Sequence, residues 1–142
     1  DDAERGLSDT QLVDDQKIRR VVLCSGKVYY DLLEERDKRK IDDVYILRIE
    51  QFYPFPAVTL SKELSRFKNA DVIWCQEEPK NQGAWTYLEP NIERLLRKVN
   101  TKIKRPKYAG RPAAASPATG LAAQHKAQQL ELIENALLKK GN

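Results

Sequence analysis

The chain has 142 residues, of which 41% are hydrophobic and 32% are charged, and its formal net charge is +4. This composition is typical of one soluble globular domain and excludes a disordered chain. No apolar stretch approaches the about 20 residues that span a bilayer, so we expect no membrane partner.

No signal-peptide pattern opens the chain. The chain lacks an initiator methionine and has no methionine anywhere, so we expect a fragment of a longer protein. Residues 1–17 contain six acidic residues and predict a linker or flexible tail, and residues 18–142 predict the folded domain. Apolar runs with β-branched residues predict strands, and apolar residues at helical spacing predict helices. The predicted strands are 20–24, 43–49, 71–76 and a short one around 104–108; the predicted helices are 28–39, 57–67, 87–98 and 121–138, with loops at 76–85 and 109–120.

Strands that alternate with helices at this spacing predict a mainly parallel sheet with helices on both faces. We therefore expect an α/β protein, a three-layer α/β/α sandwich. Leu130, Ile133 and Leu137 are expected to form the apolar stripe of the last helix, which Ser116 and Pro117 would begin as cap and first turn.

The basic residues are densest at 36–40 and 94–107. We interpret the first run as a solvated helix end, where cations are favoured by the helix dipole. A nucleic-acid surface would need stacking aromatics among such charges, so we expect no nucleic-acid partner. Cys24 and Cys75 each end an apolar strand and are expected to be reduced core thiols.

The segment 76–85 follows a buried strand and holds more hydrogen-bonding groups than a turn needs. In open parallel sheets, ligands and partners are met at the carboxyl ends of the strands. The adjacent carboxylates of Glu77 and Glu78 should diverge, which argues against a glycosidase-like pair. We expect interface residues here and on the last helix: Gln76, Glu77, Glu78, Asn81, Gln82, Trp85 and His125.

The turn from the first strand to the first helix consists of Ser25, Gly26 and Lys27. Its backbone amides and the lysine could bind a phosphate. However, the turn lacks a glycine-rich phosphate-binding motif, so we favour a plain tight turn. Arg111 lies among small residues and a proline, and it suits either a carboxylate or phosphate ligand or an ion pair inside the domain, to Glu77 or Glu78. We keep Ser25, Lys27 and Arg111 as candidate phosphate or effector contacts.

We predict no catalytic residue and no metal site in this chain. His125 is the only histidine and has no metal-ligand spacing to either cysteine. No serine lies in a nucleophile-elbow pattern.

Four blocks in register carry a specific resemblance: residues 24–32, 48–56, 76–85 and 108–117. Together they resemble the carboxyl-terminal domain of the thiamine-diphosphate-dependent first component of the 2-oxoglutarate dehydrogenase complex, over about residues 18–140. The resemblance implies a transketolase C-terminal-like fold with one antiparallel strand. It also implies a parent enzyme of the tricarboxylic acid cycle that decarboxylates 2-oxoglutarate and succinylates the lipoyl group of the dihydrolipoyl succinyltransferase.

The resemblance further implies that thiamine diphosphate and magnesium are bound by other domains of the parent, across a homodimer, and that some members bind an adenine nucleotide or acetyl-CoA near this domain. We therefore expect a non-catalytic assembly domain whose partners are the missing domains, the second subunit and the succinyltransferase. The alternative is a stand-alone nucleotide-binding module that uses the 25–27 turn. The implied location is the bacterial cytoplasm or the mitochondrial matrix. In this fragment we expect Trp74 and Trp85 to be unequally exposed.

Overall fold

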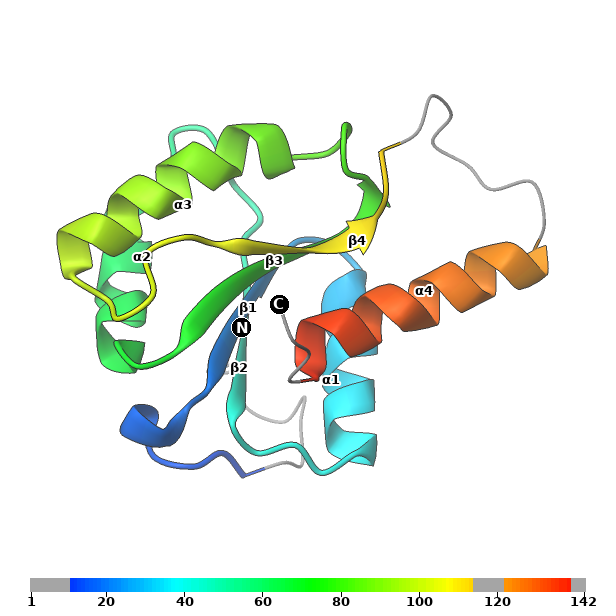
Figure 1. Ribbon diagram of the computed structural model, residues 1–142, viewed down its shortest axis with the longest axis horizontal. Coiled ribbons are helices and arrows are strands. Elements are labelled where there is room, and N and C mark those ends of the chain that lie inside the picture. The colour runs from blue at the N-terminus through cyan, green and yellow to red at the C-terminus, as the bar shows by residue number, and fades with distance from the viewer. Residues whose placement is uncertain (1–10, 114–121, 139–142) are drawn as a thin grey trace.

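The computed structural model describes residues 11–113 and 122–138, and its strands form one sheet between two layers of helices (Figure 1). The strands pair in the order β2-β1-β3-β4, and every described pair is parallel. In chain order the elements are η1 (Asp15–Lys17), β1 (Arg20–Cys24), α1 (Val28–Lys38), β2 (Val44–Arg48), α2 (Ala57–Leu64), η2 (Ser65–Phe67), β3 (Asp71–Pro79), α3 (Trp85–Val99), β4 (Lys107–Arg111) and α4 (Ala122–Leu137).

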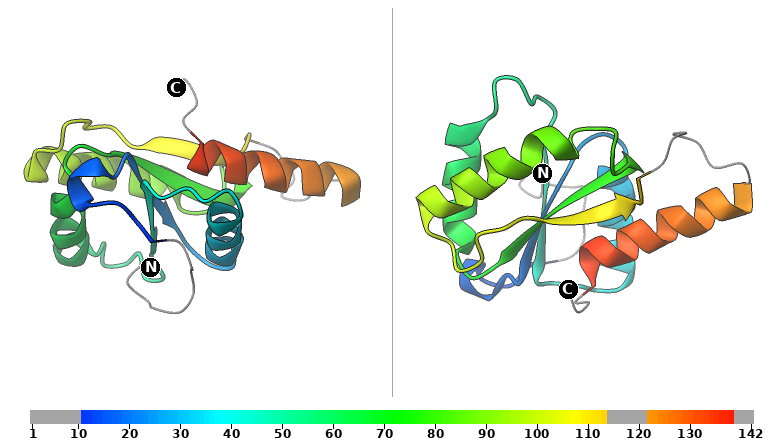
Figure 2. Two further views of the ribbon diagram at one scale, coloured as in Figure 1. Left: turned by 90° about the horizontal axis from the view of Figure 1, so that it is seen from below. Right: turned by 45° about the horizontal axis from the view of Figure 1, so that its top comes forward.

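Alternation of side chains along the strands builds a separate core on each face of the sheet. Val72 and Trp74 of β3 pack with α2 and α3, whereas Ile73 and Cys75 pack with α1 and α4. Figure 2 shows the two helical layers on opposite sides of the sheet. The three-layer parallel architecture is thus confirmed, although the four strands of the described part include no antiparallel one.

The boundaries of β3 and β4 differ from the prediction. Strand β3 continues to Pro79, and β4 includes Ala109 to Arg111, so the predicted loops at 76–85 and 109–120 begin too early. Glycine and proline made these segments look like loops, but Gly110 lets β4 approach β3: a Cβ there would lie 2.8 Å from the carbonyl oxygen of Gln76. Ser116 and Pro117 lie outside the described residues.

Three side-chain expectations were wrong. Leu130 is 48% exposed, and the buried face of α4 lies nearer its carboxyl end, at Leu132, Ile133, Ala136 and Leu137. Trp74 and Trp85 are both buried rather than unequally exposed. Arg36 is also buried, and it donates to the carbonyl oxygen of Val44 instead of facing solvent. Cys24 and Cys75 are both buried and are not joined by a disulfide, as expected.

The stretch at 11–17 contacts the domain. Val13 N–H donates to the carbonyl oxygen of Asp42, and Asp15 pairs with Arg66. The division of the chain at residue 18 stays a prediction.

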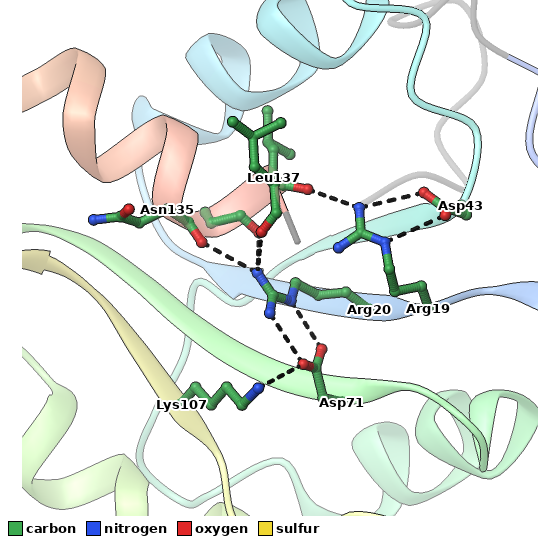
Figure 3. A network of polar contacts seen from close by, with 9 residues as sticks. Arg19, Arg20, Asp43, Asp71, Lys107, Asn135 and Leu137 are labelled. Carbon is green, nitrogen blue, oxygen red and sulfur yellow. Dashed lines mark hydrogen bonds and ion pairs between the residues drawn. The ribbon is translucent and has the colours of Figure 1, made fainter. Parts of the chain in front are cut away.

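Two arginines hold the carboxyl end of α4 at the end of the sheet where the parallel strands begin, which we call the amino edge (Figure 3). The opposite end, where the strands finish, is called the carboxyl edge. The buried Arg20 guanidinium donates hydrogen bonds to both carboxylate oxygens of Asp71, at 2.8 and 3.0 Å, and Lys107 Nζ lies 3.0 Å from the same carboxylate. Arg20 Nη1 also donates to three carbonyl oxygens at the end of α4, those of residues 135 and 136 in its last turn and that of residue 138 just after it. Arg19 pairs with Asp43 and donates to the carbonyl oxygen of Leu137. These bonds satisfy helix-end acceptors that would otherwise lack partners.

Candidate functional site

The site of interest lies where the strand order reverses. Strand β1 is followed by β2 on one side and adjoins β3 on the other, so the carboxyl ends of β1 and β3 flank a switch point. A pocket of about 330 Å³ opens there. Its lining includes the 25–26 turn after β1, the end of β3 at Glu77 and Glu78, and the aromatic side chains of Phe52 and Tyr53.

The side chain of Gln76 does not face the pocket. Side chains alternate along β3, so Gln76 lies on the same face as Trp74, and it is buried. Its Oε1 accepts from Trp74 Nε1 at 2.7 Å, and its Nε2 donates to the carbonyl oxygens of Glu78, Pro79 and Gln82 at 2.8–3.0 Å. Gly83 lies against it with φ +70°, and a Cβ there would meet the Gln76 amide at 3.0 Å. The amide therefore shapes the turn from within.

Arg111 lies on the opposite face, with Ala109 and β3 residue Glu77. It is buried, and its guanidinium donates to the carbonyl oxygen of Glu77, to Gln128 Oε1 at 3.2 Å and to Gln129 Oε1 at 2.9 Å. His125 Nδ1 lies 3.4 Å from Arg111 Nη2. The partner of Arg111 inside the domain is thus the backbone of Glu77 and two amides of α4, rather than a carboxylate.

The Glu77 carboxylate faces α1 and α4. Its Oε1 accepts from Lys27 Nζ at 2.7 Å and from Gln129 Nε2 at 3.1 Å, and Gln129 Nε2 also lies 3.2 Å from Asp31 Oδ2. The hydrogen bond that Lys27 donates to Glu77 raises the pKa of Lys27 above its ordinary value, and burial opposes this shift. Gln129 therefore links α4 to β3 and α1.

The charges at the pocket disfavour an anion. Glu77 and Glu78 are among its lining residues, and Glu50 Oε2 accepts from the Gly26 amide at 3.1 Å, at the position where a phosphate oxygen would need that donor. Lys27 is engaged by Glu77, and Arg111 is engaged by α4 and β3. Ser25 lines the pocket. The assignment of Ser25, Lys27 and Arg111 to a phosphate stays a prediction.

The other predicted interface residues are spread around this edge. Glu78 and Asn81 are exposed, Gln82 is half-buried, and His125 is exposed on α4. Trp85 begins α3 and packs on Tyr108, with ring centroids 5.3 Å apart. The structure thus joins Glu77, Arg111, Lys27 and His125 into one group, and it turns Gln76 and Trp85 inward.

Sequence reasoning missed three residues of this edge. Gln128 and Gln129 were lost among the polar residues of the last helix, and only their spacing to His125, on neighbouring turns, could have indicated a shared face. Tyr108 donates from its hydroxyl to the carbonyl oxygen of Arg111 at 2.7 Å. Burial raises the pKa of Tyr108 to about 12.

Across 11–113 and 122–138, no three side chains of the His, Cys, Asp or Glu type converge to hold a metal ion. The same stretches hold no helix with the length and apolar character of a membrane-spanning one.

The fold and this edge define a class: a parallel α/β domain whose strand-end polar groups bond chiefly to one another. Residues 3–137 match the family model described as 2-oxoglutarate dehydrogenase C-terminal. The chain therefore belongs to that family.

Named relatives agree with this membership. The chain is 60% identical over 138 residues to the 2-oxoglutarate dehydrogenase E1 component of Brucella anthropi, a match that covers 96% of this chain and 14% of the relative. It is 63% identical over 127 residues to the protein of the same name from Brucella abortus, covering 89% of this chain and 13% of the relative. The chain thus spans about a seventh of the length of these relatives.

Proposed function

We propose that this chain is the assembly domain of a 2-oxoglutarate dehydrogenase E1 component and that it performs no bond-breaking chemistry itself. Its role is to be a stable platform against which the remainder of the parent packs. Two observations support the proposal: the family membership, and the hydrogen bonds that polar groups at the carboxyl edge make to other groups of the same domain.

One observation carries the proposal: the polar groups at the switch point are used to build the edge. The Gln76 amide makes four hydrogen bonds within β3 and its turn, and Arg111 joins β4 to β3 and α4. A catalytic acid or base needs a side chain within reach of a substrate and free to exchange a proton. Buried groups committed to backbone carbonyls are suited to positioning instead.

In the parent, thiamine diphosphate and magnesium would be held outside this domain and would supply the decarboxylation chemistry. The parent would convert 2-oxoglutarate and pass a succinyl group to the lipoyl arm of an acyltransferase. Its partners would be the second subunit of a homodimer and that acyltransferase, in the bacterial cytoplasm or the mitochondrial matrix.

The test compares the isolated chain with the full-length parent. We expect the isolated chain to release no carbon dioxide from 2-oxoglutarate when thiamine diphosphate and magnesium are added, whereas the full-length protein turns over under the same conditions. Full-length Arg111→Ala should weaken the dimer more than it changes the Michaelis constant for 2-oxoglutarate. Turnover by the isolated chain, or a selective rise in that constant, would contradict the proposal.

The alternative function, a nucleotide-binding module, finds no supporting contact in the described residues. Calorimetry with AMP, ADP and acetyl-CoA on the isolated chain separates the two. We expect no heat of binding from the wild type. Glu50→Ala is the informative variant, because it removes the acceptor of the Gly26 amide and one carboxylate from the neighbourhood of the pocket. Micromolar binding by the wild-type chain would favour the alternative.

A further inference from the structure

The two most exposed large apolar side chains of the described part lie in one short segment, residues 51–58, which runs from the β2–α2 connection into the first turn of α2 and which we name the 51–58 ridge. Val58 is 86% exposed and Tyr53 is 68% exposed. The stretch from Gln51 to Ser61 contains eleven residues and no charged side chain, in a chain that is 32% charged. Large exposed apolar side chains grouped in this way mark interaction sites.

The 51–58 ridge is anchored from beneath, so its exposed side chains are presented in a fixed arrangement. Phe52 packs edge-on against Trp74, with ring centroids 5.9 Å apart. Tyr87 of α3 lies 4.3 Å from the Tyr53 ring, centroid to centroid, and its hydroxyl donates to the carbonyl oxygen of Phe52 at 3.2 Å. A surface ordered before binding loses less entropy when a partner docks.

Two hollows adjoin the 51–58 ridge. One is the switch-point pocket, which Phe52 and Tyr53 help to line. The other, of about 340 Å³, lies between the end of β2 and the start of α2 and is lined by Gln51, Pro56 and Thr59 among others. A ridge beside two hollows gives a partner both a projection to cover and recesses to fill, which is the shape complementarity of a packed interface.

We propose that the 51–58 ridge is the surface through which this domain packs against another folded part of the same parent chain. This inference rests on the proposed function. The relatives are about seven times as long as this chain, so most of a parent lies outside it and must meet this domain somewhere. Permanent interfaces are more hydrophobic than transient ones, and an uncharged ridge fits the permanent kind.

The experiment uses single cysteines as probes of exposure. The two native cysteines are fully buried, so the isolated chain has little reactive background. Val58→Cys is made in the isolated chain and in the full-length parent, and the rate of maleimide labelling at that peptide is followed by mass spectrometry. Ile103→Cys and Leu130→Cys are the matched probes, since these residues are exposed apolar positions elsewhere, at 38% and 48%.

We expect Val58→Cys to be labelled at least about tenfold more slowly in the full-length parent than in the isolated chain, because labelling then requires a local opening. If the rate at Val58→Cys is equal in both while a matched probe is slowed, the domain packs through another surface and only the ridge assignment fails. If no probe is slowed, the assembly role itself fails.

Two further arms identify the occupant. Slowing at Val58→Cys that appears in the isolated chain only at high concentration would assign the 51–58 ridge to a second copy. Slowing in the full-length parent only after the acyltransferase is added would assign it to that component. Either result would overturn the proposal that the parent's own chain covers the ridge.

Discussion

Helix α4 is held by arginines at both edges of the sheet, yet the two edges use charge differently. At the amino edge, Arg20 meets the carboxylate of Asp71 and three carbonyl oxygens at the end of α4. At the carboxyl edge, Arg111 meets no carboxylate among the described residues; it meets one backbone carbonyl, the amides of Gln128 and Gln129 and the ring of His125. The first edge is a buried ion pair, and the second is a polar network at the rim.

The difference predicts that the amino edge is the stronger clamp. A buried charge left without its partner is costly because the low-dielectric interior cannot solvate it. At the carboxyl edge, His125 and Glu78 are exposed, so water can reach part of the network and replace lost bonds. The two ends of α4 should therefore respond unequally to equivalent substitutions.

The largest effect is expected from Arg20→Ala. It removes the bidentate partner of Asp71 and three bonds to the end of α4, and it should lower the free energy of unfolding by about 3–5 kcal/mol. Urea unfolding gives the value, and hydrogen exchange should show lost protection at 132–137. Arg97→Ala is the control, because Arg97 makes an exposed pair with Glu93 worth about 0.3–0.5 kcal/mol. Equal losses in both variants would refute the stronger clamp.

A smaller loss is expected from Asp71→Asn, which keeps the shape but not the charge. Burial would raise the pKa of Asp71, but the hydrogen bonds and charge of Arg20, and then of Lys107, outweigh burial and lower it below 3.8. We expect the variant to lose about 2–3 kcal/mol at neutral pH.

The pH dependence of that loss follows from the sign of the shift. A lowered pKa in the folded state contributes stability that is complete above the unfolded value and is lost as the pH falls through the folded one. The gap between wild type and Asp71→Asn in urea unfolding should therefore be constant at neutral pH and narrow below about pH 4. A gap that widens in acid would show that Asp71 does not carry the charge in the fold.

Arg111→Ala should cost about 1–2 kcal/mol, because its lost bonds are to neutral groups that water can partly satisfy. The loss should be local: hydrogen exchange should quicken in the first half of α4 while 132–137 keep their protection. Arg111→Lys is the matched variant, since it keeps the charge but cannot bond β3 and two amides at once. Full rescue by lysine would mean that charge alone matters at this edge.

The comparison also explains what the sequence could predict. The strands and helices of the sandwich followed from short periodic patterns, since β1, β2 and α1 through α3 each carry an apolar face that is visible within a few residues. The ends of β3 and β4 could not be predicted in this way, because Pro79 and Gly110 are unfavourable residues in strands. They lie in strands here because β3 and β4 pair with each other in the fold. Local composition is a weak guide where a neighbouring strand supplies the hydrogen bonds.

The arginine clamps were invisible for a different reason. Arg20 meets Asp71 and the end of α4 across 51 and more than 110 positions of chain. Arg20 is the first residue of an apolar strand, and only the apolar residues that follow it indicated that its side chain could be buried. Gln76 was predicted as a partner-facing residue because its type is polar, but its position in the alternation, on the face of Trp74, decided its direction.

The smallest effect is expected from Lys27→Ala, which tests how weak the rim of the carboxyl edge is. Lys27 pairs with Glu77, but its side chain is 76% exposed, so the loss should stay below about 1 kcal/mol and shrink in high salt. Because its pKa is raised from 10.5, what stability the pair adds is complete below that value and is lost as the pH rises above it. Lys102→Ala, an exposed lysine with no side-chain partner in the described part, should change nothing. A loss from Lys27→Ala as large as that from Arg111→Ala, measured by urea unfolding, would mean that Glu77 depends on Lys27 and that the two edges clamp α4 by the same ionic means.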